Sequence, residues 1–175
     1  MKGRKIALIG FMGSGKSRIG QVMALRLAVP FMDSDEEIER DSARSISEIF
    51  ESEGEAAFRK LEEEFLSGLG QREGDFVLSC GGGIVMSPAN RRLLASAYDT
   101  VWIDVPLAEL LRRLAGETGH RPLLNSDDYA RKAEELLRLR RPLYAEASRF
   151  VYRWKENEST SDSASAILEI LEDDR

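Results

Sequence analysis

Cysteine is almost absent from this sequence, and long apolar stretches are missing altogether. The single cysteine, Cys80, excludes an internal disulfide and is typical of a protein from a reducing compartment. No apolar run approaches the roughly 20 residues that a membrane-spanning helix needs. The charged first residues lead directly into an apolar run at residues 5–9, which leaves no room for a signal or transit peptide. We therefore expect a cytoplasmic protein without a membrane partner.

Net positive charge is missing as well. The formal net charge is -6, so the chain is a poor general binder of nucleic acid, because neutralisation of phosphates drives that affinity. The charge is uneven, since residues 106–155 contain 11 Lys or Arg and 7 Asp or Glu. A basic segment within an acidic chain suits a small anionic ligand better than a polymer. With 175 residues and 42% hydrophobic content, the chain can form one domain with a sizeable core.

The sequence does contain a phosphate-binding loop pattern. Residues 10–17 read GFMGSGKS and fit G-x-x-x-x-G-K-[ST]. Glycines allow successive backbone N–H groups to point into one concavity, and a helix that starts at about Gly15 adds partial positive charge there. Lys16 can reach the β- and γ-phosphates of a nucleotide, and the Ser17 hydroxyl can ligate Mg²⁺. Chance would produce the pattern in roughly one chain of this length in a hundred.

The residues around this loop form the setting that the pattern requires. Residues 5–9 are an apolar run typical of a buried strand, and residues 19–27 continue as a helix with an apolar face. Strand, loop and helix in this order predict nucleotide binding.

Two acids follow a second expected strand at residues 29–32. Asp33 and Asp35 would lie beside the ligand crevice, because carboxyl ends of parallel strands line it. In an extended segment, acids two residues apart point to opposite sides, so one could serve a metal and the other a substrate. The alternative is that an Asp simply caps a helix over residues 36–40. The spacing alone leaves both possibilities open.

Three glycines, residues 81–83, follow a third expected strand at residues 76–80. A plain turn seldom needs so many, and close approach of the backbone to a ligand is the functional alternative. Cys80 at the strand end is interpreted as a small buried filler rather than a nucleophile. Arg59 lies in an expected helix that begins at residue 57 and, taken alone, is interpreted as a solvated surface charge.

A fourth strand is expected at residues 100–105 and a helix at residues 107–114. Asp104 ends an apolar run as a metal-binding carboxylate does, but a capping or turn role explains it equally well. Residues 116–128 have few apolar anchors and carry one well-placed cation, Arg121. This composition predicts a mobile lid with Arg121 as its working end, and an ordinary surface loop is the alternative.

The rest of the chain predicts a helix at residues 129–140 that is interrupted near Pro142, a strand at 149–154 and a closing helix at 166–171. Strands that alternate with helices predict an α/β fold, with a parallel sheet and helices on both faces. No internal repeat or linker is visible, so we expect a single domain over residues 1–175.

Taken in order, these motifs resemble the shikimate kinase family, small relatives of the nucleoside monophosphate kinases, over residues 5–171. The resemblance is carried by residues 10–17, 31–35, 81–83, 121–124 and 140–144, with Gly54, Glu55, Phe58, Arg59 and Glu62. It implies a P-loop three-layer sandwich whose five-stranded parallel sheet has the phosphate-loop strand at its centre, helices on both faces and a mobile lid. It also implies Mg²⁺-dependent transfer of the ATP γ-phosphate to the 3-hydroxyl of shikimate, in aromatic amino acid biosynthesis. We further expect the protein to be a monomer.

The resemblance implies a role for each matching residue. ATP would be held by Gly13, Ser14, Gly15, Lys16, Ser17, Arg18 and Arg121, with Arg113 as an adenine partner. Mg²⁺ would be held by Ser17 and, through water, Asp33. Shikimate would be bound by Asp35, Arg59, Gly81, Gly82, Gly83 and Arg140, with the two arginines on its carboxylate. The groups expected to act in catalysis are Lys16, Asp35 and Arg121.

Two positions depart from the family pattern. Arg18 stands where a second hydroxyl residue is usual, although its backbone N–H can still serve. Residues 154–160 lack the usual proline, which leaves the adenine contacts open. The rival functions are a gluconate kinase of the same fold and a catalytically silent binding module. Residues 81–83 with Arg59 and Arg140 favour a carboxylated ring over gluconate.

Overall fold

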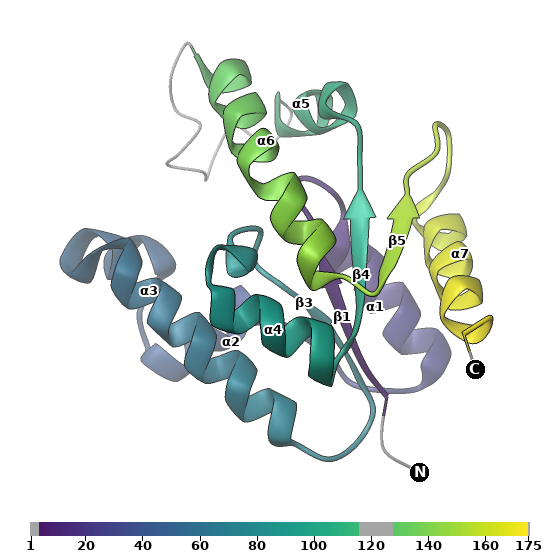
Figure 1. The fold of residues 1–175 in the computed structure, drawn as a ribbon, viewed down its shortest axis with the longest axis horizontal. Helices are drawn as coiled ribbons and strands as arrows, with labels where there is room; N and C mark the ends of the chain where they lie inside the picture. The colour runs from purple at the N-terminus through teal and green to yellow at the C-terminus, as the bar shows by residue number, and fades with distance from the viewer. Residues whose placement is uncertain (1–3, 116–127, 175) are drawn as a thin grey trace.

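The computed structural model describes residues 4–115 and 128–174, which form three layers around a central sheet (Figure 1). The strands are β1 (Lys5–Ile9), β2 (Phe31–Asp33), β3 (Phe76–Ser79), β4 (Asp99–Asp104) and β5 (Phe150–Arg153). The helices are α1 (Lys16–Leu27), α2 (Ser34–Ser42), α3 (Ile46–Gln71), the short 3₁₀ turn η1 (Ile84–Met86), α4 (Pro88–Ala97), α5 (Leu107–Ala115), α6 (Tyr129–Ala147) and α7 (Thr160–Glu172).

The five strands are parallel and lie in the order β2-β3-β1-β4-β5. This confirms the predicted sheet with the phosphate-loop strand at its centre. Residues 6–9 of β1 are fully buried, because helices cover both faces of a parallel sheet. The register pairs Leu8 with Ser79 and Ser79 with Asp33, so the ends of three strands meet at one edge. In a sheet of this kind, that edge is where ligands bind.

Helices cover the sheet in two groups. On one face α1 packs against α7, and on the other α3, α4 and α6 pack together (Figure 1). Helix α2 packs against α3 next to the edge strand β2. Within the described part of the chain, no helix is both long enough and apolar enough to cross a bilayer.

The sequence predicts a short helix at residues 45–54 that Gly54 breaks, and in the structure Gly54 divides α3 into two segments. Its φ of 84° and ψ of 173° are non-helical, and a Cβ at this position would meet nothing within 4 Å. The backbone conformation alone therefore demands glycine, since other residues rarely adopt a positive φ. The break separates the first turns of α3, whose N-terminus is capped by Ser45, from the helical segment that contains Arg59.

The expected positions of the two acids need correction. Asp33 is the last residue of β2 and α2 begins at Ser34, two residues earlier than predicted. Asp35 therefore lies in the first turn of a helix, and the argument from an extended segment is wrong for it. The helix starts early because the Asp33 carboxylate accepts a hydrogen bond from the Asp35 N–H and so caps it.

The expected interruption near Pro142 is also wrong, because α6 continues through this proline to Ala147. A proline inside a helix removes one backbone hydrogen bond and strains the preceding turn. Tyr144 and Ala147 are completely buried, so packing of the following turn offsets that loss. The closing helix is longer than predicted, since α7 begins at Thr160 after a capping box formed by Ser159 and Asp162. The predicted lid lies outside the described residues except for its last position and stays a prediction.

Candidate active site

A large pocket of about 1210 Å³ opens at the carboxyl edge of the sheet. Pockets for one small ligand typically measure about 300–1,000 Å³, so this pocket has room for two. The expected site residues in the described part of the chain all line it: Gly13, Ser14, Gly15, Lys16, Ser17, Arg18, Asp33, Asp35, Arg59, Gly81, Gly82, Gly83, Arg113 and Arg140. Arg121 lies outside the described residues.

The phosphate loop has the backbone geometry that its glycines predict. Gly10, Gly13 and Gly15 have φ values of 148°, 79° and 92°. A Cβ on Gly10 would lie 2.7 Å from the Ile103 carbonyl oxygen, so space also restricts this position to glycine. The Lys16 ammonium donates to the Gly10 and Phe11 carbonyl oxygens at 2.9 Å each, and the side chain is only 9% exposed. The loop thus holds its own lysine over the cavity where the motif places phosphates.

Ser17 and Asp33 form a contact that fits a magnesium site. The Ser17 hydroxyl donates to Asp33 Oδ2 at 2.7 Å, and the Ser79 Oγ lies 3.0 Å from the Ser17 Oγ. Hydroxyl and carboxylate oxygens are the ligands that Mg²⁺ prefers, with water and phosphate completing its shell. Asp33 also caps α2, so the capping alternative is confirmed, and the same carboxylate still faces the pocket. Ser79 was not predicted as a site residue, because its only signal in the sequence is its place at the end of a strand before the glycine run.

Asp35 faces the same pocket from the first turn of α2. Burial raises the pKa of its carboxyl group, and the nearby Asp33 carboxylate raises it further. A Cβ on Gly81 would lie 2.5 Å from Asp35 Oδ1, so only glycine allows this approach. None of residues 81–83 has a positive φ, and the need for glycine here therefore comes from space rather than from backbone conformation.

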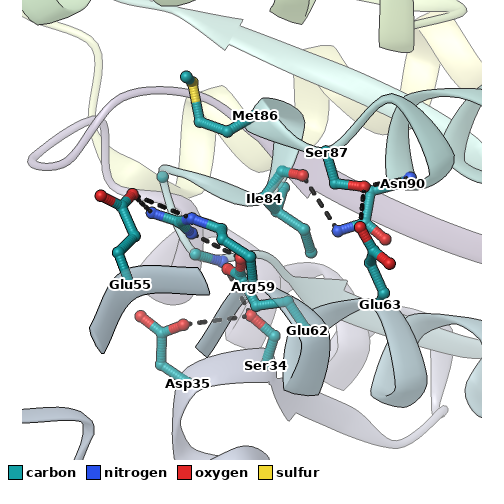
Figure 2. Close-up of polar contacts among 12 residues, drawn as sticks. Ser34, Asp35, Glu55, Arg59, Glu62, Glu63, Ile84, Met86, Ser87 and Asn90 are labelled. Atoms are coloured by element: carbon teal, nitrogen blue, oxygen red, sulfur yellow. Dashed lines mark hydrogen bonds and ion pairs between the residues drawn. The ribbon is translucent and has the colours of Figure 1, made fainter. Parts of the chain in front are cut away.

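Arg59 is not the solvated charge that the sequence suggested. Its side chain is only 18% exposed and forms ion pairs with Glu55 at 2.9 Å and Glu62 at 2.5 Å (Figure 2). A Cβ on Gly83 would collide with the guanidinium group. The interpretation failed because a helical pattern does not reveal what another part of the chain places over one face of the helix.

Arg140 approaches the glycine run from α6. It is 5% exposed, and no carboxylate in the described part of the chain lies within ion-pair distance of it. One of its terminal nitrogens lies 3.7 Å from where a Cβ on Gly82 would be, and its Nε has no hydrogen-bond partner among residues 4–115 and 128–174. A buried cation without an acid partner is costly unless an anion binds to it. The geometry therefore favours an anionic ligand between α6 and the glycine run.

Glu62 is a buried acid to which the sequence analysis gave no role. It has no exposed surface, its Oε2 accepts from Arg59, and its Oε1 has no partner within the described residues. Burial raises the pKa of Glu62 to about 7, and Arg59 opposes this shift. The signal available in the sequence was the spacing of three residues from Arg59, which puts both side chains on one helix face.

The raised pKa of Glu62 predicts how folding stability depends on pH. Because the folded protein holds this proton more tightly than the unfolded chain, the stabilisation is present at low pH and is lost as pH rises through about 7. Glu62→Gln should remove this component and narrow the difference in melting temperature between about pH 5.5 and about pH 8 by at least about 2 °C. Calorimetry at both pH values measures it.

Glu64→Gln is the matched control, since Glu64 lies on the same helix with a side chain that is 62% exposed. This variant should keep the pH dependence of the unmodified protein. If the melting temperature of the Glu62→Gln variant depended on pH as strongly as that of the unmodified protein, Glu62 would have the same pKa in the folded and unfolded states, and the prediction would be wrong.

Arg113 lies on the other side of the phosphate loop. It donates to the Gly13 carbonyl oxygen at 3.1 Å and to Glu109 at 2.6 Å, and its guanidinium lies 5.2 Å from the centroid of the Trp154 ring. This position on the pocket wall is compatible with the expected place near adenine. Asp104 does not line the pocket and pairs with Arg141 at 2.7 Å, which favours the structural alternative for this acid.

Comparison with known proteins gives one consistent result. The family model described as shikimate kinase (SKI) matches residues 12–172. A shikimate kinase from Synechococcus sp. (strain CC9605) is 42% identical over 172 residues, which cover 98% of this chain and 84% of that protein.

Solved structures agree with the sequence comparison. The structure of "Shikimate kinase from Acinetobacter baumannii in complex with shikimate" has a TM-score of 0.91 and 34% identity, and the match covers 99% of this chain and 95% of that one. A gluconokinase from Sinorhizobium meliloti has a TM-score of 0.57 and 17% identity over 98% of this chain and 94% of that one. The second likeness shows the fold alone.

Proposed function

This chain belongs to the shikimate kinase family, and from that premise we propose that it transfers the γ-phosphate of ATP to the 3-hydroxyl of shikimate, giving shikimate 3-phosphate. One observation carries the proposal for this chain's own residues. Arg140 is a buried arginine with no carboxylate within ion-pair distance among the described residues, and it faces the pocket that the phosphate loop lines. The site thus offers one place for a small carboxylate and another for phosphates.

The arginines and the glycine run would bind the acceptor. Arginine recognises a carboxylate with a planar pair of donors, and Arg140 lies near Gly82 while Arg59 lies against Gly83. Arg59 is already oriented by its ion pairs with Glu62 and Glu55, so little ordering remains to be done on binding. This arrangement would hold the ring with its hydroxyls toward Asp35 and the phosphate loop.

The phosphate loop and its lysine would bind the triphosphate of ATP. Phosphoryl transfer depends mainly on positioning and on stabilisation of charge, and the loop amides with Lys16 provide both. Ser17 and Asp33 would hold Mg²⁺, which supplies positive charge beside the β- and γ-phosphates. Lys16 would leave its carbonyl partners in the loop to reach the phosphates.

Asp35 is the group in the described pocket best placed to accept the proton of the attacking hydroxyl. Its carboxylate packs directly against Gly81, in the glycine run that is expected to bind shikimate. Its raised pKa makes it a stronger base than an exposed aspartate. The proton would pass from the substrate hydroxyl to Asp35 as the oxygen attacks the γ-phosphorus, while the bond from the γ-phosphorus to the bridging oxygen breaks and ADP leaves.

We also propose that the protein acts in the cytoplasm as a monomer in aromatic amino acid biosynthesis. The use of ATP supports the location. One chain contributes both the phosphate loop and the acceptor groups to the pocket, so the proposed site does not require a second copy.

A coupled assay of ADP release tests the proposed reaction. With shikimate as acceptor, ADP release should be rapid and should stop when EDTA removes Mg²⁺. With gluconate or with no acceptor, release should stay at the background rate. Turnover with gluconate and none with shikimate would contradict the assignment. A protein that binds shikimate and ATP without releasing ADP would instead be a binding module.

A further inference from the structure

The glycine run is held from outside by two hydroxyl groups. The Gly81 N–H donates to the Ser34 Oγ at 2.8 Å, and the Gly82 carbonyl oxygen accepts from the Tyr144 hydroxyl at 2.6 Å. The carbonyl oxygens on either side, of Gly81 and Gly83, accept from backbone N–H groups of η1 at 3.1 and 2.9 Å. The backbone oxygens of all three glycines thus have partners.

Tyr144 reaches this carbonyl from a rigid position. It has no exposed surface, and its ring stacks on Trp102 of β4 with centroids 6.0 Å apart and an interplanar angle of 28°. Tyr144 also lies one helical turn after Arg140, so one face of α6 presents both side chains to the glycine run. Burial raises the pKa of Tyr144 to about 12, so the phenol keeps its proton at neutral pH and acts as the donor.

The place of the Gly82 carbonyl oxygen shows that this hydrogen bond does more than supply a buried tyrosine hydroxyl with a partner. Gly82 lies between Gly81, which is packed on Asp35, and Gly83, which is packed on Arg59. On its other side, a Cβ at Gly82 would be 3.3 Å from the Met12 backbone nitrogen in the phosphate loop. The carbonyl group that binds the Tyr144 hydroxyl therefore belongs to the segment between the expected substrate-binding side chains, Asp35 and Arg59, and the phosphate loop.

The peptide bond converts this contact into an orientation for the next amide. The Gly82 C=O and the Gly83 N–H belong to one planar peptide unit, which is trans like the others in the described chain. Fixing the carbonyl toward Tyr144 directs the Gly83 N–H away from it. No hydrogen bond from the Gly82 or Gly83 N–H occurs within the described residues, so both remain available to a ligand.

We propose that Tyr144 is a positioning residue for substrate binding: its hydroxyl sets the peptide plane between Gly82 and Gly83, so that the Gly83 N–H can donate to the substrate carboxylate beside Arg59 and Arg140. The substrate in this inference rests on the proposed function. Tyr144 does not itself need to touch the substrate.

Tyr144→Phe tests the inference, because phenylalanine keeps the ring and its stacking on Trp102 and removes only the hydroxyl. Steady-state kinetics should show a rise of about five- to tenfold in KM for shikimate, the effect expected for one misdirected hydrogen bond. KM for ATP should change by less than twofold, because the phosphate-loop contacts do not involve this hydroxyl.

Tyr98→Phe is the matched control. Tyr98 is also buried, at 4% exposure, and its hydroxyl donates to the Leu66 carbonyl oxygen at 2.8 Å, outside the pocket lining. Both variants lose one buried hydrogen bond of the same kind, so both should melt at a lower temperature. Only Tyr144→Phe should change KM for shikimate. A loss of stability with an unchanged KM for shikimate would make the Tyr144 hydroxyl purely structural and overturn the inference.

A second measurement does not depend on turnover. In the ligand-free protein, the NMR signals of the Gly82 and Gly83 amides should shift in Tyr144→Phe, because the orientation of their peptide unit changes, and they should stay unchanged in Tyr98→Phe. If the unmodified enzyme did not phosphorylate shikimate, the proposed function would fail and these amides would still decide the inference. Unchanged Gly83 signals in Tyr144→Phe would overturn it.

Discussion

Replacing Asp35 with asparagine is expected to reduce kcat by about 10²–10⁴-fold, the usual contribution of a positioned general base. Asparagine has nearly the same shape and can still accept a hydrogen bond from a substrate hydroxyl. It cannot take up the proton of that hydroxyl or carry a negative charge. KM for shikimate should therefore change much less than kcat.

Folding should survive this substitution. The pKa of Asp35 is raised chiefly by burial, so its ionised form costs stability in the folded protein at neutral pH. Asparagine removes that cost, and the melting temperature at pH 7 should stay equal or rise. Asp33, which caps α2, is left intact. Loss of activity without loss of stability is the pattern of a residue retained for chemistry.

Asp41→Asn is the matched control for this prediction. Asp41 lies on the same helix with a side chain that is 68% exposed, and it does not line the pocket. Its variant should keep normal turnover. A fall of less than about threefold in kcat for Asp35→Asn would exclude general base catalysis by Asp35.

The pH profile of the unmodified enzyme provides an independent check on Asp35. A base must be deprotonated, so kcat should decrease as pH falls through the pKa of Asp35. Because that pKa is raised, the decrease should begin at a higher pH than for an ordinary aspartate. The small residual activity of Asp35→Asn should lack this step.

Replacing Arg140 with methionine is expected to weaken shikimate binding by roughly ten- to a hundredfold, since a charged hydrogen bond in a desolvated site contributes about 1.5–3 kcal/mol. Methionine fills a similar volume without charge. The folded protein should not suffer, because Arg140 is a buried cation that lacks an acid partner in the described chain. Calorimetric titration with shikimate measures the affinity, and titration with an ATP analogue should give a nearly unchanged value.

The neighbouring arginine offers a close control. Arg141 follows on the same helix, but it is 49% exposed and pairs with Asp104 outside the pocket lining. Arg141→Met should bind shikimate normally. Arg140→Lys should restore binding only in part, because lysine keeps the charge but lacks the planar pair of donors. Unchanged shikimate affinity in Arg140→Met would place the carboxylate elsewhere.

Most of the fold could be predicted from the sequence. The apolar runs, the glycine-rich loop after residues 5–9 and the helix break at Gly54 are local features, and each one restricts the backbone near its own position. The phosphate loop was equally readable, since its glycines and Lys16 are consecutive in the chain. The α/β alternation then allowed few sheet topologies besides the parallel one observed.

The acceptor side of the site was less predictable from local patterns. Arg59 looked like a surface charge, and no local pattern indicated a role for Glu62 or Tyr144. Each of these side chains takes its environment from a distant segment: the glycine run covers Arg59, and Tyr144 reaches Gly82 across 62 positions of the chain. The family resemblance pointed to Arg59 and Arg140 as ligands of a carboxylate, but not to their burial or to the contacts around them.

The sequence by itself therefore determined the order of elements, the phosphate loop and the helix break, because backbone conformation and periodic burial depend on neighbouring residues. Only the tertiary structure decided which charges are buried, as for Glu62 and Arg140, and that Asp33 both caps a helix and contacts Ser17. The tertiary structure also decided that α6 continues past Pro142 to Ala147. The physical reason is that burial and charge pairing are properties of contacts between distant segments, which no local pattern contains.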